Sequence, residues 1–278
     1  MTTIAYLGPA GTYSEMAALQ YLQLSHLDLE HDSVQLCPYS TIPQAIKAAE
    51  HGNVDIAVVP VENSIQGGVT MTLDSLWQSE SLQIQLAIVL PIAHALITHA
   101  QALADIKVVY SHPQGLAQCQ QWLDHYLPTV QQIATDSTTD GLHIVAEDVT
   151  VAAIASQRAA EIYNLPVLQF PINDQPDNCT RFLVLGRTAP TTKGTHSSLA
   201  FSLKRNMPGA LVKPLLVFAD RKINLSRIES RPTKRSLGEY IFFLDIEAAI
   251  DDPNFSEALL DLQAVTENLK ILGSYVIT

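Results

Sequence analysis

Short apolar runs alternate with helical patterns through the first two thirds of the chain. Strands are predicted at TIAYLG, VDIAVVP and IKVVY, because each run is apolar and ends in a polar or glycine-containing turn. Helical patterns follow these turns, and a further helix is predicted over residues 148–163. This alternation is typical of a parallel α/β fold. Such folds bind ligands where strands pass into helix starts, so a site is expected at that edge.

A different pattern begins after Gly186. The segment RTAPTTKGTHSS is rich in Thr, Ser, Pro and Gly and is interpreted as a linker. The rest of the chain shows strands and helices in the order βαββαβ, which is the ferredoxin-like pattern. A sheet with an open edge often pairs with a copy of itself. The predicted division is an α/β domain over residues 1–187, a linker over 188–197 and a ferredoxin-like domain over 198–278.

The net charge of −12 is unevenly distributed along the chain. Residues 1–186 contain 18 acidic residues and four cations, Lys47, Lys107, Arg158 and Arg181. This balance argues against a nucleic-acid partner. An anion bound by this half must be attracted by those few cations or by backbone N–H groups at helix starts.

The composition predicts a cytoplasmic protein without a metal site. The amino terminus lacks the charged, apolar and cleavage regions of an export signal. Cys37, Cys119 and Cys179 are widely spaced, so a disulfide framework is not expected. The nine histidines show no metal-ligand spacing. Residues 81–104 lack Asp, Glu, Lys and Arg, but their glutamines, histidines and proline favour paired strands over a membrane span.

The turn GPAGT after the first strand has three possible interpretations. It resembles a phosphate loop only loosely, and it can also be a structural turn or an anion-binding helix start. Thr12 and Glu15 have the spacing of a capping box, in which each side chain satisfies one early backbone N–H of the helix.

Polar residues also follow the other two predicted strands. Glu62 and Asn63 either contact a ligand or belong to a solvated loop. Ser111 is a candidate helix cap, and the adjacent His112 is the one histidine of functional interest.

The segment DNCTRFLVLG places a hydroxyl and a guanidinium where a buried strand is predicted to begin. Cys179 is interpreted as a small buried hydrophobe rather than a nucleophile. A partly buried Arg181 needs a partner, because an unpaired buried charge is very costly. That partner is either an internal carboxylate, Glu62 or Asp177, or the carboxylate of a ligand with the Thr180 hydroxyl as a neighbouring donor.

Five motifs, in order, carry a family resemblance that covers essentially the whole chain. GPAGTYSE, VPVENSIQGGV, SHPQGLAQC and NCTRFLVLG closely resemble prephenate dehydratase, and NMPGALVKPLLVFADRKINLSRIESRP resembles the ACT regulatory domain attached to that enzyme. The resemblance implies two α/β lobes around a cleft, similar to periplasmic binding proteins. It also implies the decarboxylating dehydration of prephenate to phenylpyruvate, a carbon–oxygen lyase reaction of L-phenylalanine biosynthesis that needs no cofactor.

The resemblance assigns roles within this site. Thr180 is expected at the departing ring hydroxyl, either as a proton donor or as a hydrogen-bond donor. Our hypothesis is that Arg181 holds the pyruvyl carboxylate, whereas neutral donors surround the ring carboxylate, which must lose its charge as CO2. The predicted substrate-binding residues are Thr12, Glu62, Asn63, Ser64, Ser111, Gln114, Arg181 and Phe182.

In the C-terminal domain, PGALV and ESRP can be a simple helix start and strand end. In the family they line a phenylalanine pocket between paired ACT domains. The resemblance therefore implies feedback inhibition by L-phenylalanine and a homodimer or homotetramer formed through these domains, with Glu229 expected to receive the amino group. The predicted effector-binding residues are Gly209, Ala210, Leu211, Val212, Asn224, Leu225, Glu229, Ser230 and Arg231.

Two alternative functions are compatible with the sequence. One is arogenate dehydratase, which performs the same chemistry on the amino analogue, and the other is a noncatalytic amino-acid-binding sensor. The chain departs from the family at Gly115, where relatives usually have Ala, and over residues 131–149, where the match is poor. Because no chorismate mutase segment precedes the first strand, the separate enzyme is expected rather than the fused one.

Overall fold

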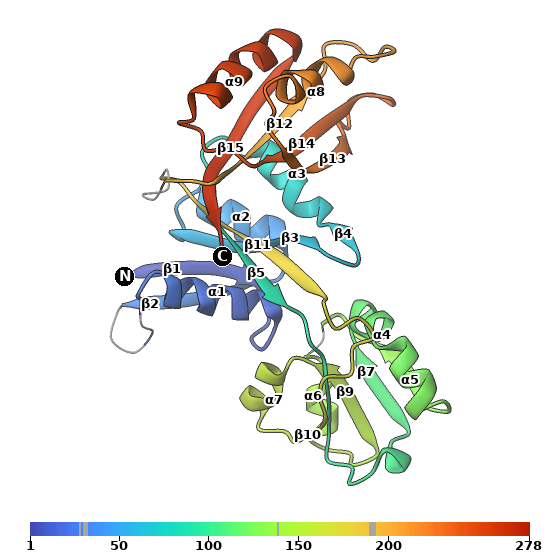
Figure 1. Ribbon diagram of the computed structural model, residues 1–278. Helices are drawn as coiled ribbons and strands as arrows, with labels where there is room; N and C mark the ends of the chain where they lie inside the picture. Colours follow the sequence, from blue (N-terminus) through green and yellow to red (C-terminus); the bar gives the residue numbers. More distant parts are fainter. Residues whose placement is uncertain (28, 30–32, 138, 189–192) are drawn as a thin grey trace.

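Two α/β lobes and a C-terminal α/β domain make up the computed structural model (Figure 1). The structure describes residues 1–27, 29, 33–137, 139–188 and 193–278. The chain leaves the first lobe after Pro91, builds the second lobe, and returns to the first lobe at Cys179. The first lobe contains β1 (Thr2–Leu7), α1 (Tyr13–Leu24), β2 (Val34–Tyr39), α2 (Ile42–Glu50), β3 (Ile56–Asn63), β4 (Gly67–Gly68), α3 (Thr70–Gln78), β5 (Gln83–Pro91) and β11 (Cys179–Gly186).

The first-lobe sheet has the order β5-β11-β3-β1-β2, and β11 runs antiparallel to both of its neighbours. Successive residues of a strand point to opposite faces of the sheet. Phe182 and Val184 therefore pack with α1 on one face, whereas Leu183 and Leu185 pack with α2 and α3 on the other. This alternation decides which side chains of β11 reach each face.

The second lobe is built on a sheet of order β10-β6-β9-β7-β8. Two segments join it to the first lobe, one between β5 and β6 and the other between β10 and β11 (Figure 1). The two segments are bonded to each other, since the backbone N–H of Ile92 donates to the carbonyl of Asn178 at 2.8 Å. The elements of this lobe are β6 (Ala95–Thr98), a 3-10 turn (Leu103–Asp105), β7 (Val108–Ser111), α4 (Pro113–Gln118), α5 (Gln120–Tyr126), β8 (Gln131–Ala134), α6 (Leu142–Val145), β9 (Val151–Ala155), α7 (Gln157–Tyr163) and β10 (Val167–Gln169).

The helix predicted over residues 148–163 is wrong in its first half. Val151–Ala155 form β9, which is fully buried between β6 and β7, and the helix α7 covers only Gln157–Tyr163. The run VAAIA is continuously apolar, and its periodicity cannot distinguish a buried strand from a buried helix. The central position of this strand in the sheet decided its conformation.

Residues 81–104 form strands, as their composition predicted, but β5 and β6 belong to different sheets rather than to one pair. The segment therefore crosses from one lobe to the other. Within the described part of the chain, no helix has the length and apolar character needed to cross a membrane.

The C-terminal domain has the predicted order βαββαβ. Helices α8 and α9 cover one face of its sheet around Phe201, Phe218 and Phe255, and the other face lies against the first lobe. Strand β15 pairs with β12 and also runs parallel to β5, so a ten-stranded sheet continues from this domain into the first lobe. The elements are β12 (His196–Ser202), α8 (Val212–Ala219), β13 (Leu225–Pro232), β14 (Tyr240–Ile246), α9 (Pro253–Val265) and β15 (Asn268–Ile277).

The boundary between the domains differs slightly from the predicted one. Strand β12 begins at His196, two residues before the predicted start of the domain at residue 198. Residues 189–192 of the predicted linker lie outside the described residues. The C-terminal domain is therefore attached through paired strands as well as through the linker.

Candidate active site

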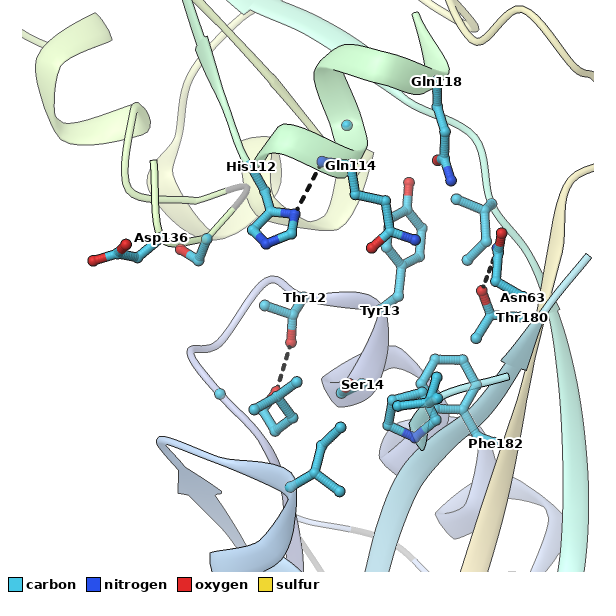
Figure 2. Close-up of a pocket in the computed structure, with 18 of the residues that line it drawn as sticks. Thr12, Tyr13, Ser14, Asn63, His112, Gln114, Gln118, Asp136, Thr180 and Phe182 are labelled. Carbon is cyan, nitrogen blue, oxygen red and sulfur yellow. Dashed lines mark hydrogen bonds between the residues drawn. The ribbon is translucent and has the colours of Figure 1, made fainter. Parts of the chain in front are cut away.

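A cavity of about 350 Å³ lies between the two lobes. Figure 2 shows polar side chains of both lobes pointing toward this space. The cavity borders Asn63 at the end of β3 and His112 directly after β7, which is the edge where the strand pattern predicted a ligand site. Its polar lining consists of Thr12, Tyr13, Ser14, Ser40, Asn63, His94, His112, Gln114, Gln118, Asp136, Ser137 and Thr180.

Thr180 and Asn63 face each other across the paired strands β11 and β3. Nδ2 of Asn63 donates to Oγ1 of Thr180 at 2.9 Å (Figure 2). The same nitrogen lies 2.8 Å from Oδ1 of Asn178 and 3.1 Å from the carbonyl oxygen of Cys179. Thr180 is only 8% exposed but borders the cavity. The Asn63 amide therefore fixes the Thr180 hydroxyl, and Thr180 still lines the cavity in which a ligand would bind.

A turn sets the orientation of the Asn63 amide. Its Oδ1 accepts hydrogen bonds from the backbone N–H groups of Ile65 and Gln66, both at 3.1 Å. Nδ2 must therefore face Thr180, whose oxygen accepts the hydrogen bond. The hydroxyl proton of Thr180 is then available for donation into the cavity. The pair is consequently built to donate a hydrogen bond to a ligand.

Thr12 caps helix α1 at the wall of the cavity. Its Oγ1 accepts a hydrogen bond from the backbone N–H of Glu15 at 3.4 Å, as the predicted capping box requires. The Glu15 carboxylate, however, accepts from the backbone N–H of Gly11 at 2.7 Å rather than from that of Thr12. The start of this 12-residue helix points its positive dipole end toward the cavity.

The helix cap of α4 is His112 and not Ser111. Nδ1 of His112 accepts from the backbone N–H of Gln114 at 3.2 Å, and both residues line the cavity (Figure 2). Ser111 still belongs to β7, is fully buried, and donates to the carbonyl oxygen of Ile154 at 2.7 Å. The prediction that Ser111 binds substrate is therefore corrected, because its side chain points into the sheet.

His94, Gln118 and Tyr13 form a second polar group at the cavity. Nε2 of His94 donates to Oε1 of Gln118 at 2.8 Å, and Nδ1 lies 3.4 Å from the Tyr13 hydroxyl, which donates to the carbonyl of Ala93 at 2.7 Å. Burial lowers the pKa of His94 below its ordinary 6.5, although the Gln118 hydrogen bond acts in the opposite direction. Burial also raises the pKa of Tyr13. Both side chains are therefore neutral near pH 7.

Sequence reasoning missed this group. His94 lies on the segment between β5 and β6, where no motif marks it, and Gln118 belongs to the motif SHPQGLAQC but was not among the predicted site residues. The helical spacing of four residues between the two glutamines was the available signal, since it places both on one face of α4. In the part of the chain that the structure describes, Nε2 of Gln118 is buried without a hydrogen-bond partner. Gln118 lines the cavity, but this nitrogen itself is shielded from solvent.

Arg181 does not border the cavity. Its guanidinium pairs with Glu62 at 3.0 Å and with Asp245 of the C-terminal domain, on the opposite face of the sheet. The physical reason is strand alternation, which sends the side chains of Thr180 and Arg181 to opposite faces. The hypothesis that Arg181 holds a substrate carboxylate is therefore corrected. Glu62 lies on the same face as Arg181, so the prediction that Glu62 binds substrate is corrected as well. The ion pair between Arg181 and Glu62 is one of the two internal pairings that the sequence left open.

Ser64 lies in the exposed turn after β3 and not on the cavity wall. Its Oγ accepts from the backbone N–H of Cys179 at 3.0 Å and lies 3.3 Å from Oδ1 of Asn178. Ser64 therefore supports the start of β11 instead of contacting a ligand. Of the other predicted substrate-binding residues, Thr12, Asn63, Gln114 and Phe182 line the cavity with Thr180.

The cavity has a neutral wall. Among the described residues that line it there is no lysine or arginine, and Asp136 at its exposed rim is the one carboxylate. An anionic ligand would therefore be held by amides, hydroxyls and the start of α1. The described residues include no group of three or more His, Cys, Asp or Glu side chains placed to hold a metal ion.

The predicted effector-binding residues do not all lie on the same face of the C-terminal domain. Residues 209–212 precede and begin α8, and residues 224–231 precede and form β13. Along β13, Glu229 and Arg231 face the first lobe, whereas Ser230 is exposed on the other face. Arg231 pairs with Asp74 of the first lobe, and Glu229 pairs with Arg227 of its own strand. In this structure the Glu229 carboxylate pairs with Arg227, and its expected role toward an amino group stays a prediction.

Comparison with known proteins places both parts of the chain in described families. The prephenate dehydratase family matches residues 4–190, and the ACT domain matches residues 197–264. A bifunctional chorismate mutase/prephenate dehydratase of Aquifex aeolicus is 40% identical over 273 residues, which cover 98% of this chain and 73% of that protein. A prephenate dehydratase of Bacillus subtilis is 34% identical over 286 residues, which cover 98% of each chain.

A solved structure is similar over nearly the full length. The crystal structure of prephenate dehydratase in complex with L-Phe from Arthrobacter aurescens has a TM-score of 0.88 and 34% identity, and the match covers 99% of this chain and 90% of that one. The resemblance predicted from five sequence motifs is thus confirmed. This chain belongs to the prephenate dehydratase family.

Proposed function

We propose that this chain converts prephenate to phenylpyruvate, CO2 and water, the step that leads toward L-phenylalanine. The family match over residues 4–190 and the relatives named prephenate dehydratase support this activity. The observation that carries the proposal is the hydrogen bond from Asn63 to Thr180 at the wall of a cavity without cationic side chains among its described residues.

The reaction needs one proton and no redox partner. The bond between the ring and its carboxylate breaks, and its electron pair enters the ring. The bond between the ring and its hydroxyl oxygen breaks at the opposite carbon, and that oxygen leaves with its electron pair. The prephenate dianion and one proton thus give the phenylpyruvate anion, CO2 and water. Formation of the aromatic ring supplies the driving force, so the protein must mainly assist departure of the hydroxide.

Thr180 is the residue that we assign to the departing oxygen. Because its own oxygen accepts from Asn63, the Thr180 hydroxyl is polarised and becomes a stronger donor. It can stabilise the developing negative charge through a hydrogen bond, as an oxyanion-hole donor does. It can also deliver the proton, with the same geometry, if a second group returns a proton to the threonine.

Neutral groups hold the two carboxylates in this proposal. Donors at the cavity include the N-terminal end of α1 at Thr12 and the Gln114 side chain, and Gln118 carries an unpartnered, buried Nε2 beside them. A close ion pair with the ring carboxylate would stabilise the substrate more than the transition state, in which that charge leaves as CO2. A cation-free wall therefore favours decarboxylation.

Regulation by L-phenylalanine is the second part of the proposal. The ACT domain match over residues 197–264 and the L-Phe complex of the Arthrobacter aurescens relative support it. Residues 209–212 and Ser230 are exposed or partly exposed, and Leu211 packs with the core on the helix side of the sheet, so a pocket that includes them would be completed by a second copy.

The proposed oligomer forms through the ACT domains. Strand β13 is the terminal strand of the ten-stranded sheet (Figure 1). Ile228 of this strand and Val212 and Leu216 of α8 are exposed apolar side chains of the same domain. A free sheet edge with exposed apolar neighbours is suited to pairing with another copy, as a homodimer or within a homotetramer. The cytoplasmic location stays a prediction of the sequence.

The test is incubation of the purified protein with prephenate, with detection of phenylpyruvate and CO2, in parallel with a mixture that lacks protein. Release of both products in equal amounts, and their reduction by L-phenylalanine, is expected. Arogenate serves as the comparison substrate, because a faster reaction with arogenate would assign the chain to the alternative dehydratase. No product from either substrate would refute an enzymatic function and favour the amino-acid sensor.

A further inference from the structure

A cluster of charged side chains joins the first lobe to the ACT domain directly behind Thr180. Arg181 and Glu62 come from β11 and β3, and Arg227, Glu229 and Asp245 come from β13 and β14. Arg181 pairs with Asp245 and lies 3.0 Å from Glu62, while Nε of Arg227 lies 3.4 Å from the same Glu62 carboxylate. The five side chains form one connected cluster across the domain boundary.

The cluster is buried and cannot rearrange without cost. The side chains of Arg181, Arg227 and Asp245 are 12%, 9% and 8% exposed. The second oxygen of Asp245 accepts from Ser198 at 2.6 Å, and Arg227 also pairs with Glu229. A buried charge that loses its partner is strongly destabilised, so these side chains must move together.

The cluster lies one residue away from the proposed catalytic contact. In the register of β11 and β3, Thr180 faces Asn63 and Arg181 faces Glu62. The hydrogen bond of the first pair borders the cavity, and the ion pair of the second lies on the opposite face. The register shifts immediately afterwards, between Arg181 and Phe182. A regular ladder is interrupted there, so side-chain contacts contribute more to the position of this strand end.

Strand β13 connects this cluster to the predicted effector site. Arg227 and Glu229 alternate along it with residues that face outward, including Ser230. The Glu229 carboxylate lies directly against Gly68 of the first lobe, where a Cβ would overlap it. A displacement of β13 would therefore change the ion pairs of Arg227 and Glu229 and the packing against the first lobe.

We infer that Arg181 is a positioning residue for Thr180, and that its ion pairs with Asp245 and Glu62 couple the ACT domain to the catalytic contact. This inference rests on the proposed function. The cluster holds the end of β11 so that the Thr180 oxygen stays within hydrogen-bond distance of Asn63. Movement of β13 upon effector binding shifts Asp245 and Arg227, and through Arg181 it changes the Thr180–Asn63 contact. The effector then lowers turnover more than it lowers substrate affinity.

Asp245→Asn tests this coupling, because Asp245 lies in the ACT domain and does not border the cavity. The kcat and KM for prephenate are measured in the full-length protein with and without L-phenylalanine. We expect kcat to fall about 3- to 30-fold, the range of such couplings, with KM changed less than about twofold. The ratio of rates without and with L-phenylalanine should move toward one.

Asp261→Asn is the matched control. Asp261 pairs with Arg221 at 2.5 Å in the same domain, but its side chain is exposed and outside the cluster. The same chemical change should there leave kcat, KM and the inhibition ratio at the values of the unmodified protein. An equal effect of both substitutions would overturn the inference, since it would show a general response to lost ACT ion pairs.

Glu62→Gln keeps the test decisive if Asp245→Asn does not fold. Glu62 is partly exposed, and Arg227 keeps its pairs with Glu229 and Asp245 when the Glu62 charge is removed. The same fall in kcat at nearly constant KM is expected, and Arg181→Lys should retain more turnover than Arg181→Met, because it keeps the charge.

Folded Asp245→Asn or Glu62→Gln protein with unchanged kcat would overturn the positioning role. A lower kcat with the original inhibition ratio would overturn the coupling to the ACT domain. Failure of the proposed function is distinguishable from both, because the unmodified protein would then form no phenylpyruvate.

Discussion

Thr180 and Arg181 are neighbours in β11, yet their side chains leave the strand on opposite faces of the sheet. Thr180 accepts from Asn63 at the cavity wall, and Arg181 pairs with Glu62 and Asp245 behind it. One strand end thus carries the proposed catalytic hydroxyl on one face and the contact with the ACT domain on the other. Substitutions at either position should therefore lower turnover, but only those at Arg181 should also change the response to L-phenylalanine.

Removal of the Thr180 hydroxyl should reduce turnover much more than affinity. For Thr180→Val we expect kcat to fall by about 10²–10³, the cost of removing one donor to a developing oxyanion, with KM changed less than about threefold. Steady-state formation of phenylpyruvate measures both constants. Thr180→Ser keeps a hydroxyl within reach of Asn63 and should therefore retain most of the turnover that Thr180→Val loses. Near-normal kcat in Thr180→Val would refute the catalytic assignment.

Asn63→Asp should reverse the direction of the central hydrogen bond. A carboxylate oxygen in place of Nδ2 accepts the Thr180 proton, which is then withheld from substrate. We expect a fall in kcat of about 10²-fold or more, similar to that of other lost oxyanion donors. Because both residues act as one unit, the double variant Asn63→Asp/Thr180→Val should be little slower than Thr180→Val alone. Multiplicative losses in the double variant would contradict this arrangement.

The imidazole of His94 should have a pKa below its ordinary value. Burial lowers the pKa of His94 from 6.5, the hydrogen bond to Gln118 notwithstanding. As the pH falls below 6.5, the unfolded chain takes up this proton before the folded protein does, so the group makes folding less favourable toward lower pH. NMR titration of the imidazole, assigned by comparison with His94→Gln, gives the midpoint. A midpoint at or above 6.5 would show that the ring is hydrated or charged in the folded protein.

Asp74 should stabilise the protein only above the pH at which its carboxyl is ionised. Burial raises its pKa, but hydrogen bonds from Arg231 and Lys234 outweigh this and lower it below 3.8. A lowered folded pKa gives stability that is present above the unfolded value of 3.8 and is lost as the pH falls through the folded value. The unmodified protein should therefore exceed Asp74→Asn in Tm at neutral pH, with the difference vanishing in acid.

The size of this difference should be modest, because the ion pairs lie near the surface. Exposed pairs contribute about 1 kcal/mol or less, which corresponds to a Tm difference of about 2–4 °C in a chain of this size. Thermal unfolding of both proteins from about pH 7 to about pH 3 measures it, a range that brackets the titration of a carboxyl. A difference that persists unchanged in acid would mean that the substitution disturbs packing around Asp74 rather than removing a charge.

The sequence predicted most elements from local pattern alone. The period of the apolar residues and the turn residues around them were enough for the βαββαβ domain and for the strands at TIAYLG, VDIAVVP and IKVVY. Thr12 was recognised as a cap because its contact with the N–H of Glu15 is local. The failure at Val151–Ala155 has the opposite cause, since a uniformly apolar run has no period from which strand and helix can be told apart.

The sequence by itself determined the family, the order of the elements and the residues that carry the motif chemistry, because these depend on residue identity and on contacts within a few positions. Tertiary structure alone decided which motif residues meet. Arg181 and Ser111 carry suitable groups, but the strand phase points one toward Asp245 and the other into the sheet. His94 reaches the cavity only because the segment between β5 and β6 passes between the lobes. Such positions follow from packing between distant segments, which no local pattern records.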